Sequence, residues 1–537
     1  MSDPLNEKPS HFHCVRCMLV IIEYLCAMRL SFRYRCAMPS GAVWLFLALL
    51  AASQAFAQET ALIRLIQADE ISYDKRANAQ VQVLTGNIIL EHDGVYLYCD
   101  TAYLNDAENR VEAMGDIHVE SRDTLHLYGK HIWYDGNTKI GEIEREVVLI
   151  DNQTTLYTDF LLYDRNTQVT EYHKGGRIIS QDNELLSKTG YYYIREKTFA
   201  FSRDVVLNDP DYTMRADTMR YATGTEIANF IGPTHIESDD FYIYCLTGWF
   251  DTRNDRSYLG KGSLVRTGDQ TLTADSIYYE QKSGLGRAYH NVTVTDTVQN
   301  IILKGNYSIY NKEQQFSMIT DSALAIMADR EDSLFMHADT LIAYFDSAQK
   351  AQDLYAYHKV KFYRTDIQGM CDSLHNDIAD SVLTLYKDPV LWSDENQLTA
   401  DSIRIWFRSK QIDRMQLHNI SLIISMDDSA RFNQIRGLNM MGYFVDNELN
   451  RIRVESNSET IYYVRDDDES LIGINKAVSG SMWIFISDNT IERIVYIDHP
   501  TAILYPEKDM PEQEKMLRGF SWKADQRPLD KYGIFSW

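Results

Sequence analysis

The chain has 537 residues, of which 45% are hydrophobic and 12% are aromatic. Its 77 Asp and Glu residues outnumber its 53 Lys and Arg residues, which gives a formal net charge of −24 at pH 7. A charge of this sign and size argues against nucleic acid as a partner.

The first 57 residues have the pattern of a secretory signal. Residues 41–55 are apolar, basic residues precede them, and Ala55-Phe56-Ala57 provides an A-x-A cleavage site. The apolar run is shorter than the roughly 20 residues that a membrane span needs, although an uncleaved anchor stays open as the alternative. We therefore predict a signal peptide region over 1–57, with Met28 or Met38 as the true start. The rest of the chain is then expected in the periplasm, with association to the outer membrane left open.

From residue 66 to residue 422, a pattern of the type Leu-x-Ala-Asp-x-Ile-x-Tyr returns about every 30 residues. Its clearest copies are 272–279 and 398–405. We call the Asp position of this pattern the anchor. Anchors are assigned to Asp69, Asp100, Asp159, Asp217, Asp275, Asp339 and Asp401, with Lys130, Lys188, Gly248 and Gly305 as substitutes. Such repetition indicates that one supersecondary unit is stacked many times.

Within each repeat, apolar and polar residues alternate with a period of two, and Tyr, Ile, Val and Thr are frequent. This pattern is typical of β-strands. Each repeat contains two short strand segments joined by a polar turn such as 103–109, which is rich in Asn and Asp. The repeats therefore predict a continuous all-β architecture.

The side of the strand that is apolar changes at the anchor. Apolar or small residues lie at minus three and minus one before the anchor, and at plus two and plus four after it, as in Met214, Ala216, Met219 and Tyr221 around Asp217. An uninterrupted strand would keep one parity, so the change predicts a bulge or corner at each anchor. Aligned corners would fold the strands into two facing sheets around a long slot. The small residues expected at the inside corner are Ala68, Ala216, Ala274, Ala338 and Ala400, and the anchor Asp is predicted to point outward and stabilise the turn.

The minus-three and plus-two positions are the candidates for lining this slot. They are Leu97, Leu127, Ile132, Leu156, Leu161, Met214, Leu272, Ile277, Leu398 and Ile403. Two interpretations remain open for each of them, a lining of an open groove or the packed core of an ordinary β-sandwich.

Motifs that carry catalysis or bind metals are missing from the sequence. There is no Gly-x-Ser-x-Gly, no His-Glu-x-x-His and no phosphate-binding loop, and the histidines show no metal-ligand spacing. Cys99, Cys245 and Cys371 occupy small or apolar positions of the repeat, and we expect them to be buried. We predict no enzyme activity, no cofactor and no metal site.

Several segments together resemble a known family. They are 68–73 followed by Thr85-Gly86-Asn87-Ile88, 111–119, and 272–279 followed by His290-Asn291-Val292. This series resembles the OstA-like (organic solvent tolerance N-terminal-like) family, whose members include the periplasmic bridge protein of lipopolysaccharide transport. The resemblance covers residues 62–425, and less clearly extends to 465.

The resemblance implies an elongated antiparallel β-jelly roll, open along one edge, whose apolar groove carries the acyl chains of lipopolysaccharide toward the outer membrane. It also implies lipopolysaccharide or a related lipid as a partner, other bridge proteins joined through edge strands, and outer-membrane assembly components. Physical chemistry is compatible with this role, because each methylene exposed to water costs about 0.8 kcal/mol. The alternative function is a secreted or surface β-solenoid that acts as an adhesin or scaffold without lipid cargo.

The expected organisation has three parts. Residues 1–57 are the signal peptide region, 58–465 are the OstA-like repeat jelly roll as one module or two fused modules, and 466–537 are a capping region with a charged tail. The last boundary rests on Asp466-Asp467-Asp468-Glu469 and on the prolines that follow, where the repeat pattern is lost.

Overall fold

The computed structural model describes residues 61–73, 81–121, 125–180, 183–328, 332–347, 350–409, 411–428, 430–466, 468, 470–487 and 490–537. The predicted signal peptide region, 1–57, lies outside the described residues. The chain divides into Met1–Ala61 and a compact unit Leu62–Trp537, and every strand of the described residues belongs to the second unit. In the described part of the chain, no helix has the length and apolar character needed to cross a membrane.

The second unit is built almost entirely of strands. Its first strands are β1 (Arg64–Gln67), β2 (Glu70–Tyr73), β3 (Val81–His92), β4 (Val95–Asn105), β5 (Arg110–Ser121), β6 (Leu125–Asp135), β7 (Ile140–Asp151), β8 (Thr154–Asp164), β9 (Val169–Tyr172), β10 (Gly176–Ser180), β11 (Asn183–Ser187) and β12 (Thr189–Tyr193). The middle strands are β13 (Thr198–Asn208), β14 (Thr213–Ala222), β15 (Ile227–Glu237), β16 (Phe241–Asp251), β17 (Arg256–Thr267), β18 (Gln270–Glu280), β19 (Leu285–Asp296), β20 (Ile301–Asn311), β21 (Phe316–Met327), β22 (Leu334–Phe345), β23 (Ala351–Tyr363) and β24 (Gln368–Asp377). The last are β25 (Val382–Tyr386), β26 (Val390–Ser393), β27 (Asn396–Thr399), β28 (Ser402–Arg408), β29 (Gln411–Met426), β30 (Phe432–Val445), β31 (Glu448–Arg465), β32 (Leu471–Ser487), β33 (Thr490–Ile497) and β34 (Thr501–Tyr505), followed by the short 3-10 turns η2 (Glu507–Asp509), η3 (Glu512–Glu514), η4 (Ala524–Gln526) and η5 (Gly533–Phe535).

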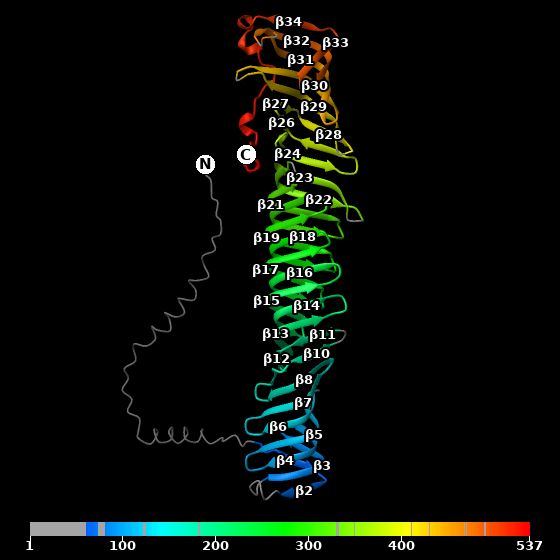
Figure 1. Cartoon of the computed structure of the whole chain (residues 1–537), viewed down its shortest axis with the longest axis vertical. Helices are drawn as coiled ribbons and strands as arrows, with labels where there is room; N and C mark the ends of the chain where they lie inside the picture. The colour runs from blue at the N-terminus through cyan, green and yellow to red at the C-terminus, as the bar shows by residue number, and fades with distance from the viewer. Residues whose placement is uncertain are drawn as a thin grey trace, which may run out of the picture. The chain divides into compact units, whose positions relative to one another are not determined.

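The 34 strands of the described residues belong to one hydrogen-bonded sheet, in which strands that follow one another in the chain also lie next to one another in the stack (Figure 1). Neighbours such as β4 and β5, or β17 and β18, pair antiparallel. Some strands are interrupted at the corner, so that β11 and β12 together pair with the single strand β13. The fold is therefore the predicted all-β antiparallel jelly roll, and not the parallel β-helix that the solenoid alternative would require.

Each long strand bends at the predicted corner, and elsewhere the corner separates two short strands such as β11 and β12. Between β3 and β4, Thr85 pairs with Thr101 and Ile88 pairs with Cys99, so that two residues of β3 oppose the single anchor Asp100. The same register shift separates the two arms of the later strands, for example at Asp275 in β18. The corner prediction is confirmed, but the extra residue lies on the strand opposite the anchor. One arm of each strand, such as Val95–Cys99, thus lies in a first layer and the other arm in a second layer.

Two of the assigned anchors were wrong. Between β15 and β16 the register shift brackets Leu246, because Thr247 pairs with Ile231 and Cys245 pairs with Thr234. Between β19 and β20 it brackets Asn306. Neither repeat has an anchor Asp, so the sequence pattern was aligned on the nearby glycines, Gly248 and Gly305. These glycines instead occupy inward positions, plus two and minus one.

The minus-one position is the crowded inside of the corner, as predicted. Of the five predicted alanines, Ala216, Ala274, Ala338 and Ala400 are buried there, and Ala68 is half-buried. The three cysteines Cys99, Cys245 and Cys371 are buried at the same position, before Asp100, Leu246 and Asp372. A small side chain is needed because both layers approach each other most closely at the corner.

The strand stack extends beyond the expected boundary at residue 465. Strand β32 bends at Gly480, and its two arms pair separately with β33 and β34. The backbone corner thus persists where the side-chain motif has been lost, and the stack ends at Tyr505. The loss of the motif predicted the end of the repeat at the acidic segment that begins at Asp466, but Asp466 and Asp468 lie between two paired strands, β31 and β32.

The segment after Tyr505, Pro506–Trp537, runs back along the outside of the stack (red in Figure 1). Its side chains Met510 and Leu517 are buried in a cluster with Leu422, Ile424 and others. This cluster is separate from the slot, because the alternating residue Ile423 packs against the core between the layers. Outward glutamines hold the segment: Gln434 Nε2 donates to the carbonyl of Lys515 (2.9 Å), and Gln397 Nε2 donates to the carbonyl of Ser521 (2.7 Å).

Candidate functional site

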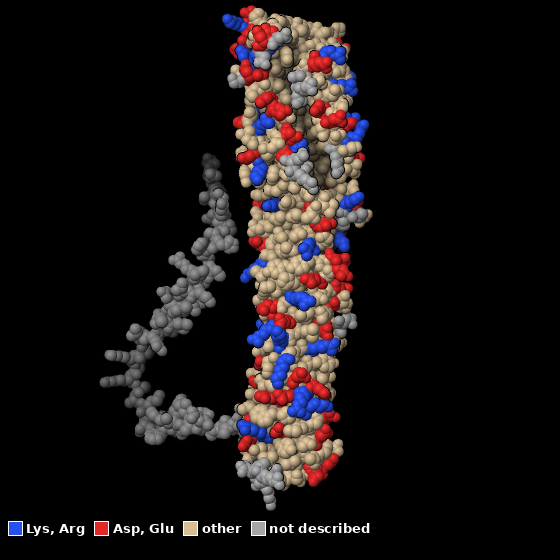
Figure 2. All heavy atoms as spheres, viewed as in Figure 1, with Lys and Arg blue, Asp and Glu red and all other residues tan. Residues whose placement is uncertain are grey.

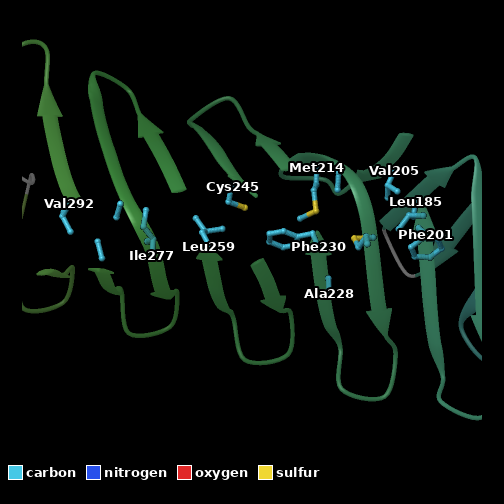
Figure 3. Packing of buried hydrophobic residues seen from close by; sticks show 14 of the residues in the cluster. Leu185, Phe201, Val205, Met214, Ala228, Phe230, Cys245, Leu259, Ile277 and Val292 are labelled. Carbon is cyan, nitrogen blue, oxygen red and sulfur yellow. The ribbon is translucent and has the colours of Figure 1, made fainter. Parts of the chain in front are cut away.

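The space between the two layers is lined by apolar side chains along the stack. Figure 3 shows Met214, Phe230, Leu259 and Ile277 pointing from both layers into this space. Because each repeat contributes two strands to the stack, one repeat adds about 10 Å to the length of the slot. A continuous apolar strip of this kind is the candidate functional site.

The ten predicted lining residues all face this interior. Eight are buried: Leu97, Leu127, Ile132, Leu156, Leu161, Met214, Ile277 and Ile403. The other two, Leu272 and Leu398, are half-buried and pack against the same cluster. The alternation in the sequence therefore identified residues that share the interior between the layers. Their role in lining a lipid-binding groove stays a prediction.

The middle of the slot, from β16 to β20, is more open than its N-terminal section. Inward side chains away from the corner are only half-buried there, both in the first layer and in the second. They are Ile243, Leu272 and Leu303 in the first layer, and Phe250, Tyr279 and Tyr310 in the second. In the N-terminal section the equivalent residues, Leu97 and Leu104, are buried.

Polar side chains bridge the two layers at the mouth of the N-terminal section, which is the edge opposite the corners. His92 Nδ1 lies 2.8 Å from the hydroxyl of Tyr134. Arg165 donates to the Tyr134 hydroxyl (2.9 Å) and to the carbonyl of His92 (3.2 Å). Since arginine is always a donor, the Nδ1 atom of His92 that faces it accepts, and the Tyr134 O–H points toward Nδ1. Burial raises the pKa of Tyr134, so this hydroxyl stays protonated.

Two further bridges close the mouth, and a third contact between the layers lies closer to the corner. Lys139 Nζ lies 2.6 Å from an oxygen of Asp93, and the hydroxyl of Tyr192 donates to Asp151. Burial and the Asp151 carboxylate both raise the pKa of Tyr192. At the other end of the stack, the hydroxyls of Thr460 and Tyr496 lie 3.0 Å apart. The slot is thus latched by polar contacts near both ends.

These bridging residues were not predicted. Tyr134 lies at the inward plus-four position of the motif and Arg165 at plus six from its anchor, whereas Asp93 and Lys139 lie in turns between strands. A polar residue at an inward position is the signal that could have identified them, because a buried polar group requires a partner.

Below the His92–Tyr134–Arg165 bridge lies a small cavity. It holds about 50 Å³ of free space, and apolar side chains of β3 to β7 form most of its wall. Pockets for small ligands measure roughly 300 Å³ or more. An acyl chain can therefore enter this section only if the two layers move apart.

The outer faces are polar and carry mixed charge. Figure 2 shows basic and acidic side chains interspersed along the face in view. The anchors point outward as predicted and hold the corner: Asp100 Oδ2 accepts from the backbone N–H of Asp116 (2.9 Å), and Asp275 accepts from the side-chain amide of Asn291 (3.1 Å). The anchor carboxylates are therefore structural.

The buried thiols are poor nucleophiles. Burial raises the pKa of Cys99 to about 12 and that of Cys245 to about 11, which keeps both protonated. Within the described ranges, no group of three or more His, Cys, Asp or Glu side chains is arranged to hold a metal ion.

Residues 60–217 match the family model of OstA-like proteins. A comparison with curated proteins finds no match. Among solved structures, the chain is similar to LptH of Pseudomonas aeruginosa, described as the LptA-homologous periplasmic component of the lipopolysaccharide transport device. The identity is 8%, the alignment covers 26% of this chain and 96% of LptH, and the TM-score of 0.20 is too low to support an argument. The family match stands on its own: residues 60–217 form an OstA-like segment, and the chain resembles the OstA-like family of lipopolysaccharide-transport bridges.

Proposed function

We propose that this protein binds the acyl chains of lipopolysaccharide, or of a related lipid, in the slot between its two layers and carries them across the periplasm toward the outer membrane. The half-buried apolar side chains of the middle section carry this proposal. Ile243, Leu272 and Leu303 face the second layer without being fully covered by it. Burial of such apolar surface by a ligand contributes about 25 cal/mol of binding free energy for each Å² removed from water.

The two ends of the stack support a chain of such proteins. Among the described residues, β1 and β2 pair only with β3, and β33 and β34 pair only with β32. Exposed apolar side chains lie on both end strands, including Ile66 (57% exposed) and Leu504 (52% exposed). Unpaired strand edges with apolar side chains accept further strands. Other bridge proteins and outer-membrane assembly components are therefore the proposed protein partners.

Photo-crosslinking in cells tests the lipid proposal. A photoreactive residue is placed at Leu156, Leu272 or Leu398, all of which face the slot, and at the outward positions Arg220 and Arg404 as controls. We expect lipid adducts at the inward positions, stronger at Leu272 and Leu398 than at Leu156, because the first two are only half-buried. Adducts at none of the inward positions, in protein that is folded and exported, would refute the proposal and favour a scaffold with a closed core.

A further inference from the structure

The polar bridge at the N-terminal mouth and the cavity beneath it form one amphipathic site. His92, Tyr134 and Arg165 line the cavity together with Leu90, Leu97, Val119, Leu127, Ile132 and Ile143. The polar atoms are at the solvent edge and the aliphatic side chains lie deeper, toward the corner. A ligand that fits such a site has a polar head and an apolar chain.

The charge at the head of the site is positive. Among the described residues, the guanidinium of Arg165 donates only to neutral acceptors, which are the Tyr134 hydroxyl, His92 Nδ1 and the carbonyls of His92 and Asp93. An anion would replace these with shorter and stronger charge-assisted hydrogen bonds, and the planar guanidinium fits two oxygens of a phosphate at once.

Glu91 also lines the cavity and Asp93 lies beside it, and each of these two carboxylates is paired with a cation. Glu91 lies 2.5 Å from Arg64, and Asp93 lies 2.6 Å from Lys139. Both are therefore compensated and repel an incoming anion only weakly. His92 lies next to the guanidinium, with its Nδ1 3.2 Å from an Arg165 nitrogen, so an anion bound to Arg165 would also contact the imidazole.

Resting on the proposed function, we propose that Arg165 and His92 form a binding site for the phosphate of a lipid headgroup, with an acyl chain of the same lipid in the cavity below. In the closed slot Arg165 and Tyr134, which both belong to the second layer, hold the first layer through their contacts with His92. When the layers part, Arg165 gives up its hydrogen bonds to His92 and donates to the phosphate between them instead, so that opening of the mouth is coupled to arrival of the headgroup.

Calorimetric titration of the full chain tests this site with three probes: dodecyl phosphate, dodecanol and inorganic phosphate. We expect dodecyl phosphate to bind about tenfold or more tightly than dodecanol, because charge-assisted hydrogen bonds distinguish them. Arg165→Gln should abolish this difference while leaving dodecanol binding in place. Arg220→Gln, which removes an outward cation that lies over Tyr193, is the matched control and should leave the difference unchanged.

Thermal unfolding of each variant establishes that it is folded. If Arg165→Gln is unstable, Arg165→Lys serves instead, since it keeps the charge but not the planar fork, and the preference for phosphate should then fall without vanishing.

Equal affinity for the two alkyl ligands in the unmodified protein, or a preference that survives in folded Arg165→Gln, would overturn the headgroup site alone. Inorganic phosphate binding as tightly as dodecyl phosphate would also overturn it, because the acyl chain would then contribute nothing. Failure of both alkyl ligands to bind would instead count against the proposed function.

Discussion

The corner at Gly115 provides a quantitative test of how the anchors shape the fold. Gly115 has φ +100°, and a Cβ added to it would lie 2.7 Å from the Cβ of Asp100 and closer still to its carboxylate. Gly175, between β9 and β10, has φ +93° and no atom within 4 Å of such a Cβ. Gly175→Ala therefore measures the backbone strain alone, which should lower the local free energy of unfolding by about 1–3 kcal/mol because a residue with a side chain is forced to adopt such a φ. Gly115→Ala adds the steric clash, about 1–3 kcal/mol more.

The assay is native-state hydrogen exchange of β4 and β5 for Gly115→Ala, and of β9 and β10 for Gly175→Ala. Local exchange is preferred because stacked repeats open in parts and a single global transition is not assured. The double variant Asp100→Ala/Gly115→Ala should recover most of the additional loss. Asp100→Ala alone should cost about 0.5–1.5 kcal/mol, for the lost hydrogen bond to Asp116 N–H. Equal losses at the two glycines, or no recovery in the double variant, would refute the steric account of the corner.

Three further predictions concern the core, the N-terminal edge and the C-terminal segment. Leu161→Ala, at a fully buried inward position, should destabilise β7 and β8 by about 2–5 kcal/mol in hydrogen exchange, whereas the neighbouring Leu162→Ala should cost much less; similar losses would contradict the inward parity. The Gly94 N–H and Arg64 hold the pKa of Glu91 below its usual 4.5. The protection of β1 from hydrogen exchange should therefore be present above pH 4.5 and be lost as the pH falls through the lowered pKa. In Glu91→Gln this acid dependence should disappear, and its persistence would refute the assignment. Leu517→Ala should release the C-terminal segment and increase binding of a hydrophobic dye. Lipid adducts at Leu272 should stay unchanged, because the cluster around Leu517 is separate from the core between the layers. Loss of the adducts would show that the segment acts on the slot.

Local sequence patterns were sufficient to predict the bent strand, but they did not predict contacts between side chains of different repeats. The parity change around Asp217 and the small Ala216 predicted the corner. Both follow from the bend itself, which every repeat forms with its own residues and which leaves little room on its inner side. Contacts such as Arg165 with His92 join residues 73 positions apart, and no local period encodes them. The continuation of the stack past Arg465 was missed for a related reason, since backbone pairing tolerates the loss of the motif at Gly480.

The role of the slot is tested most directly by native mass spectrometry of the protein purified from cells with an outer membrane. We expect the unmodified protein to retain an acylated lipid, Leu272→Asp to lose it, and Thr273→Asp to retain it, because Thr273 has the opposite, outward parity on the same strand. Absence of lipid from the folded unmodified protein, or equal retention in the two variants, would contradict the account of the slot as a lipid carrier.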